Sequence, residues 1–116
     1  MAAGDFTEPP LFVKTYEFMV WLAQEVIRFP RSQRFVLAQR LEGEGLELLK
    51  GMILGRLGLD KSRNLKMCDG QLQVLRVLLR LARDLQVLSF DRYEQGIRHL
   101  DEIGRLLGDW QKRTRK

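Results

Sequence analysis

Six apolar residues in the middle of the chain recur at alternating intervals of three and four positions: Leu65, Cys68, Leu72, Leu75, Leu79 and Ala82. This alternation places all six on one side of an α-helix, as in the buried seam of a helical bundle. The helix is expected to run from about Ser62 to Val87. A helix this long and amphipathic needs partners to cover its apolar side, so the pattern favours other helices in the rest of the chain.

The same segment carries a second apolar side. At about 100° per residue, five residues point away from the seam, namely Val74, Val77, Leu78, Leu81 and Leu85. One bundle needs one apolar stripe per helix, and a second exposed stripe is typical of a protein contact. We therefore expect these five residues to form an oligomer interface. The alternative is that tight packing within one chain covers Leu78 and Leu81.

Three further helices are indicated by apolar periodicity between start and stop signals. The first lies between Pro10 and Pro30, and its expected buried stripe is Phe12, Tyr16, Met19, Ala23 and Val26. The second starts after Ser32 as N-cap and reaches the turn at Gly58, with Leu37, Leu41, Leu48 and Met52 inside. The last follows Ser89 as N-cap and turns Tyr93, Ile97, Leu100, Ile103, Leu107 and Trp110 inward.

The second helix is rich in glycine, at Gly43, Gly45, Gly51 and Gly55. Such glycines indicate close packing against a neighbouring helix, or a break near Gly51. No segment shows the alternation of a half-buried strand. The sequence thus predicts an all-α fold, an antiparallel up-and-down four-helix bundle over residues 11–111. An N-terminal extension, 1–10, would precede it and a basic tail, 112–116, would follow.

Positive charge is concentrated in two places. Four of the net five positive charges belong to the C-terminal residues Lys112, Arg113, Arg115 and Lys116, which leaves the rest of the chain at +1. Arg76, Arg80 and Arg83 share one edge of the 62–87 helix, where guanidinium groups could bind phosphates. These seven residues are the candidate nucleic-acid contacts. The helix arginines could instead pair with carboxylates of neighbouring helices, such as Glu42, Glu44, Glu47, Asp101 and Glu102.

Catalytic and metal-binding patterns are missing from the sequence. His99 precedes Glu102 by three positions, but a di-iron bundle takes two such motifs and more carboxylates. Cys68 lies in the apolar seam, where burial raises a thiol pKa and keeps it unreactive. We expect no enzyme, no metal and no cofactor. A leader pattern and a membrane-spanning run are also missing, so we expect a cytoplasmic protein that makes no membrane contact.

Three stretches together resemble a known family: FPRSQRFVLAQRL at 29–41, LRVLLRLARDL at 75–85 and YEQGIRHLDEIGRLLGDW at 93–110. They are similar to four-helix-bundle proteins that include the accessory variability determinant of diversity-generating retroelements. The same superfamily contains proteins encoded in intervening sequences of bacterial large-subunit ribosomal RNA genes. The resemblance extends from about Leu11 to Trp110. Members often have Gly-Gly-Trp where this chain has Gly108-Asp109-Trp110.

The resemblance implies a homopentamer whose bundles form a barrel with a central channel and a basic surface. It implies a non-enzymatic scaffold that binds nucleic acid, RNA or DNA, and the reverse transcriptase of a retroelement during mutagenic copying. The family's basic positions on the third helix correspond to Arg76 and Arg80, and its basic C-terminal end to Lys112, Arg113 and Arg115. The intervening-sequence branch implies the alternative, a protein-only helical scaffold that binds no nucleic acid.

Overall fold

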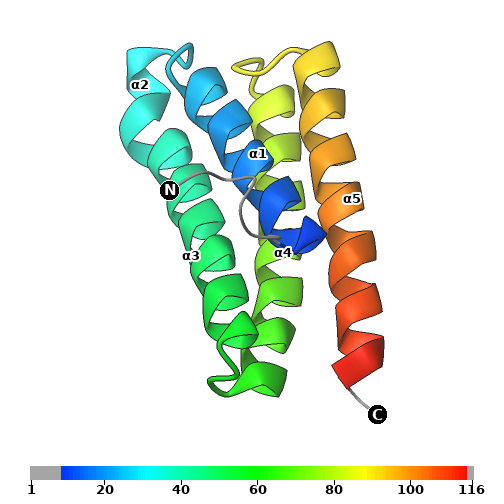
Figure 1. Ribbon diagram of the computed structural model, residues 1–116. Helices are drawn as coiled ribbons and strands as arrows, with labels where there is room; N and C mark the ends of the chain where they lie inside the picture. Colours follow the sequence, from blue (N-terminus) through cyan, green and yellow to red (C-terminus); the bar gives the residue numbers. More distant parts are fainter. Residues whose placement is uncertain (1–8, 115–116) are drawn as a thin grey trace, which may run out of the picture.

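A computed structural model describes residues 9–114 of the chain as four long helices packed side by side (Figure 1). These are α1 (Pro10–Val26), α3 (Gln39–Arg56), α4 (Lys61–Asp84) and α5 (Phe90–Thr114). A short helix α2 (Arg31–Gln33) and a π-helical turn η2 (Arg34–Ala38) lead directly into α3. Residues 9–114 contain no strand. The predicted all-α four-helix fold is confirmed.

The long helices run alternately up and down, and each packs on two neighbours (Figure 1). α3 contacts α1 and α4, and α5 contacts α1 and α4, so that α3 and α5 lie diagonally across the bundle. Gly58, at φ 80°, makes the turn between α3 and α4 that its position predicts. The Ser89 hydroxyl accepts a hydrogen bond from the backbone N–H of Arg92 at 3.1 Å, which confirms it as the N-cap of α5.

The seam predicted on α4 is confirmed residue for residue. Leu65, Cys68, Leu72, Leu75, Leu79 and Ala82 are its buried residues. The inward residues predicted on α3 and its approach are buried as well, namely Leu37, Leu41, Leu48 and Met52. On α5, Leu100, Ile103 and Leu107 are buried, while Tyr93, Ile97 and Trp110 pack against the core from its margin.

The predicted stripe of α1 is correct at Val26 and elsewhere wrong by about one position. The buried side of α1 is formed by Leu11, Thr15, Phe18, Leu22, Glu25 and Val26. Tyr16, expected inside, is exposed. Apolar residues make up more than half of this helix, so its periodicity fits two different stripes. The predicted stripe leaves out two polar residues, Thr15 and Glu25, that are in fact buried. Both are satisfied inside: the Thr15 hydroxyl donates to the Leu11 carbonyl at 2.8 Å, and Glu25 pairs with Arg92 at 3.2 Å.

The start of the second helix is also corrected. Its first helical residue is Arg31, after Pro30, so Ser32 lies inside the helix and is not the N-cap. Pro30 is the N-cap residue, and no side chain caps this helix start. The helix stays continuous at Gly51, and its irregularity falls earlier, at the π-turn η2.

Close packing was predicted at all four glycines of α3, and it is confirmed at three of them. A Cβ on Gly51 would lie 2.7 Å from the Cys68 sulfur of α4, and one on Gly55 would lie 3.2 Å from Leu65. Gly45 faces Met19 of α1. Gly43, by contrast, has open space around it. α3 is therefore held against both neighbours by backbone approach.

A glycine of α5 offers a test of this packing. A Cβ on Gly96 would lie 2.7 Å from the Trp21 ring and 2.8 Å from Leu79, while one on Gly108 of the same helix meets nothing within 4 Å. Overpacking costs about 1–3 kcal/mol, and alanine recovers up to about 1 kcal/mol in helix propensity. We expect Gly96→Ala to lower the free energy of unfolding in urea by about 1–2 kcal/mol and Gly108→Ala to leave it unchanged or raise it. Equal stability of the two variants would contradict this packing.

Candidate functional site

The second apolar side of α4 is uncovered in the single chain. Val74, Val77, Leu81 and Leu85 are between 41% and 52% exposed. Leu78 differs, because it is half-buried and packs against the core. The alternative that one chain covers both Leu78 and Leu81 is therefore wrong for Leu81. The four exposed residues, with Leu78 at their edge, form what we call the α4 stripe.

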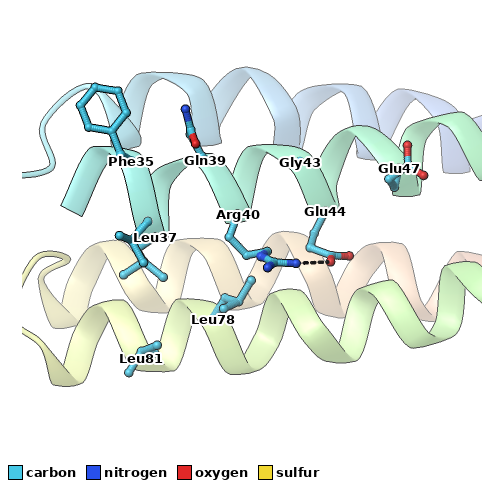
Figure 2. A pocket seen from close by; sticks show the side chains of 10 residues that line it. Phe35, Leu37, Gln39, Arg40, Gly43, Glu44, Glu47, Leu78 and Leu81 are labelled. Atoms are coloured by element: carbon cyan, nitrogen blue, oxygen red, sulfur yellow. Dashed lines mark ion pairs between the residues drawn. The ribbon is translucent and has the colours of Figure 1, made fainter.

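An open hollow of about 720 Å³ lies beside this stripe, between η2, α3 and α4. Leu78 and Leu81 face it from α4, and Arg40 and Glu44 reach into it from α3 as a pair 3.9 Å apart (Figure 2). The π-turn adds Phe35 and Val36 to its rim, and these side chains are 74% and 70% exposed. π-helical turns are rare and are frequently found at functional sites.

Sequence reasoning did not assign Phe35 and Val36 to any surface. The signal was present, because Phe35, Val36, Leu37 and Ala38 are four consecutive apolar residues, more than one buried stripe can hold. Only the last two are buried.

A second uncovered apolar area lies on the other side of α3. On α1 it comprises Tyr16, Val20 and Ile27, and on α3 it comprises Leu46 and Ile53, all of them exposed. The α1 residues follow one another at helical spacing on one side of that helix. We call this area the α1/α3 face. The chain thus presents two different apolar surfaces, which flank α3.

The three arginines of the basic edge are held differently, although all three lie on the side of α4 toward α5. Arg76 Nη1 donates to Asp101 Oδ1 at 2.6 Å and Nη2 to the Leu100 carbonyl at 3.4 Å, so this guanidinium is tied to α5. Arg83 pairs with its neighbour Asp84 at 2.9 Å and lies over the Tyr93 ring.

Arg80 is the exception on that edge. Its side chain is exposed and forms no hydrogen bond or ion pair with any residue in 9–114. Of the three arginines proposed as phosphate contacts, Arg80 alone is therefore both exposed and available within the described part of the chain.

The C-terminal basic residues begin inside a helix. α5 continues to Thr114, past the boundary at 111 expected from the sequence, so Lys112 and Arg113 lie in its last turn. There they are exposed, next to helix carbonyls that favour positive charge. Arg115 and Lys116 lie outside the described residues.

The two chemically reactive side chains of the core do not form a site. Burial, helped by Asp69, raises the pKa of the Cys68 thiol to about 11. His99 packs against Phe18 and Trp21, with ring centroids 5.9 Å and 5.6 Å away, and burial lowers its pKa. Across residues 9–114, no group of three or more His, Cys, Asp or Glu side chains is placed to hold a metal ion.

None of the described helices is both long and apolar enough to span a bilayer.

Comparison with known protein families agrees with this arrangement. The family described as bAvd-like matches residues 11–114, which include all four long helices. The chain belongs to the bAvd-like family. No curated protein matches the chain. The resemblance inferred from the sequence is thereby confirmed at the level of the family.

The environment of Cys68 makes a prediction about reactivity. With a pKa near 11 against the ordinary 9.0, the thiolate fraction at pH 8 falls by about two orders of magnitude. We expect iodoacetamide to alkylate the folded chain at least about 100-fold more slowly than the urea-unfolded chain, as followed by mass spectrometry. Because the folded-state pKa is raised, the neutral thiol adds stability that is lost above pH 9. Rapid alkylation of the folded chain at pH 8 would contradict this burial.

Proposed function

We propose that this bAvd-like chain is a non-enzymatic scaffold that assembles as a homopentameric ring and binds nucleic acid together with a reverse transcriptase. The observation that carries the proposal is the exposure of the α4 stripe in the single chain. Family membership supports it, because accessory members of this family work as assemblies. As proposed, the scaffold works without a catalytic residue, metal or cofactor of its own. Its activity consists in holding partners.

The two apolar surfaces support a ring. A cyclic assembly uses heterologous contacts, in which one surface of each subunit meets a different surface of the next. The α4 stripe and the α1/α3 face are two such surfaces, and they lie on opposite sides of α3. A two-fold dimer would need only one surface that pairs with itself.

Nucleic-acid binding is supported by the cations without carboxylate partners. Arg80 on α4 and Lys112 and Arg113 on α5 are exposed and make no ion pair within residues 9–114. Arginine and lysine on a bundle surface reach phosphates more readily than base edges, so binding should depend weakly on sequence. The reverse transcriptase is proposed as a partner from family membership.

A specific observation favours a second candidate, a protein-only scaffold. Arg76 and Arg83, which belong to the proposed basic edge, are paired with Asp101 and Asp84. If pairing is the role of the whole edge, the ring binds proteins alone, as proposed for the intervening-sequence branch.

The ring makes a complementation prediction. Leu81→Glu and Val20→Glu each place a charge in one apolar surface, and each should yield a folded monomer because both side chains are exposed in the single chain. Mixing the two variants should restore one intact contact per pair and give a heterodimer, measured by analytical ultracentrifugation. Ile27→Lys should match Val20→Glu, since both lie on the α1/α3 face. A mixture that stays monomeric would contradict the heterologous contact.

Nucleic-acid binding is tested by fluorescence anisotropy on duplex DNA in a salt titration. We expect Arg80→Gln to lower the log–log slope of affinity against salt by about 0.9 for each phosphate that Arg80 neutralises. Arg105→Gln removes the same charge from a residue already paired with Glu102 and Asp109, and should leave the slope unchanged. Absence of salt-sensitive binding by the unmodified protein, to duplex and to single-stranded DNA alike, would favour the protein-only scaffold.

A further inference from the structure

All four long helices contribute to two adjoining hollows at one end of the bundle, where α3 and α5 end and α1 and α4 begin. One hollow has a volume of about 300 Å³ and the other about 410 Å³. They share Pro9, Leu11, Arg56 and Trp110. Trp110 thus stands between the hollows. We call the pair the end cleft.

The smaller hollow is apolar. It is lined by Leu11 and Phe12 of α1, Met52 and Ile53 of α3, and Leu57 after α3, together with Trp110. The Trp110 indole reaches this place because Gly55 leaves room for it, with the ring 3.6 Å from where a Cβ would stand. A flat apolar group of modest size fits such a lining better than a charged side chain does.

The larger hollow is cationic. Arg56 comes from the end of α3, Lys61 from the first residue of α4 and Arg113 from the last turn of α5. None of these three forms an ion pair with a carboxylate among residues 9–114, unlike Arg76 and Arg83. Asp109 also lines this hollow, and its carboxylate forms an ion pair with Arg105 at 3.7 Å. The ammonium group of Lys61 lies 5.3 Å from the centre of the Trp110 ring.

We propose that the end cleft binds an unpaired nucleotide of a single-stranded nucleic acid. The phosphate contacts Arg56, Lys61 and Arg113, and the base lies in the apolar hollow against Trp110. Three cations facing one hollow complement the charge of a phosphodiester, and an adjoining aromatic and apolar hollow complements a base. This inference rests on the proposed function, because it names where and in which form the nucleic acid binds.

The same geometry argues against a duplex as the occupant. In a duplex the bases are stacked and paired inward, so that only phosphates and groove edges reach a protein surface. The cationic hollow could contact such a backbone, but the apolar hollow would stay empty. A single strand can turn one base out and fill both.

The test measures binding of a fluorescein-labelled oligothymidylate and of the same strand paired with oligoadenylate, by anisotropy at several salt concentrations. We expect Arg56→Gln with Lys61→Gln to weaken single-strand binding by about tenfold or more. The log–log salt slope should fall by at most about 0.7, the value for one neutralised phosphate on a single strand, because these cations contact the same phosphate. Duplex affinity should fall by less than single-strand affinity, because a duplex can contact only the cationic hollow.

The matched control is Arg28→Gln with Lys66→Gln, which removes the same charges from exposed residues outside the cleft. It should change single-strand affinity by less than about twofold, since it removes no contact in the cleft.

Trp110→Leu distinguishes the contribution of base stacking in the apolar hollow from that of phosphate contacts in the cationic hollow. It should weaken single-strand binding by at least about fivefold while leaving the salt slope unchanged, because stacking releases no counterions. A second readout uses Trp21→Phe, which leaves Trp110 as the sole tryptophan. Oligothymidylate should quench its fluorescence, and the duplex should not. Circular dichroism and urea unfolding of each variant identify any loss of binding that is caused by misfolding.

The outcomes distinguish the inference from the proposed function. Single-strand and duplex binding that both survive the cleft substitutions would overturn the end cleft and leave the scaffold intact. No binding of either probe by the unmodified protein would overturn both. Binding of phosphatidylglycerol vesicles that depends on Arg56 and Lys61, without oligonucleotide binding, would assign the cleft to an anionic lipid and overturn the inference.

Discussion

The backbone approach of α3 to both of its neighbours is the interaction on which the other surfaces depend. Gly51 admits the Cys68 sulfur of α4, and Gly55 admits Leu65 and the rim of the Trp110 ring. At these distances α3 meets α4 through the α4 seam, so the stripe at Val77 and Leu81 has to face outward. The same glycine stretch shapes the end cleft, because a larger residue at Gly55 would crowd the indole. Packing inside the chain thereby decides which apolar residues remain exposed.

Much of this fold could be predicted from the sequence, because buried seams repeat at helical spacing. The α4 seam was predicted correctly because its six residues recur at alternating intervals of three and four positions. The same reasoning failed for α1, because a helix that is apolar on most sides has several possible buried stripes. Packing against the other helices determines which of these stripes is buried. Thr15 and Glu25 are buried since the chain supplies a carbonyl and Arg92 to satisfy them, which composition could not reveal.

The candidate site was less accessible to sequence reasoning. Arg76 and Arg80 differ by about 40° around the α4 axis, yet one is paired with Asp101 and the other projects free of the described carboxylates. Which arginine is paired depends on the register of α5 against α4, a quantity that no local pattern encodes. The end cleft shows the same limit, since Arg56 and Lys61 are adjacent to a turn in sequence and meet Trp110 only because the bundle closes.

Cyclic symmetry links the ring to the end cleft. Rotation about one axis places every copy of Trp110 at the same height, so in the proposed pentamer all clefts open on a single rim. Five weak sites on one rigid rim raise avidity without a new contact, provided that one ligand can reach several of them. A single strand bends freely between sites, whereas a duplex is stiff over a length far greater than one bundle. In the proposed ring, five copies of the end cleft would therefore amplify the preference for single strands that we propose for each cleft.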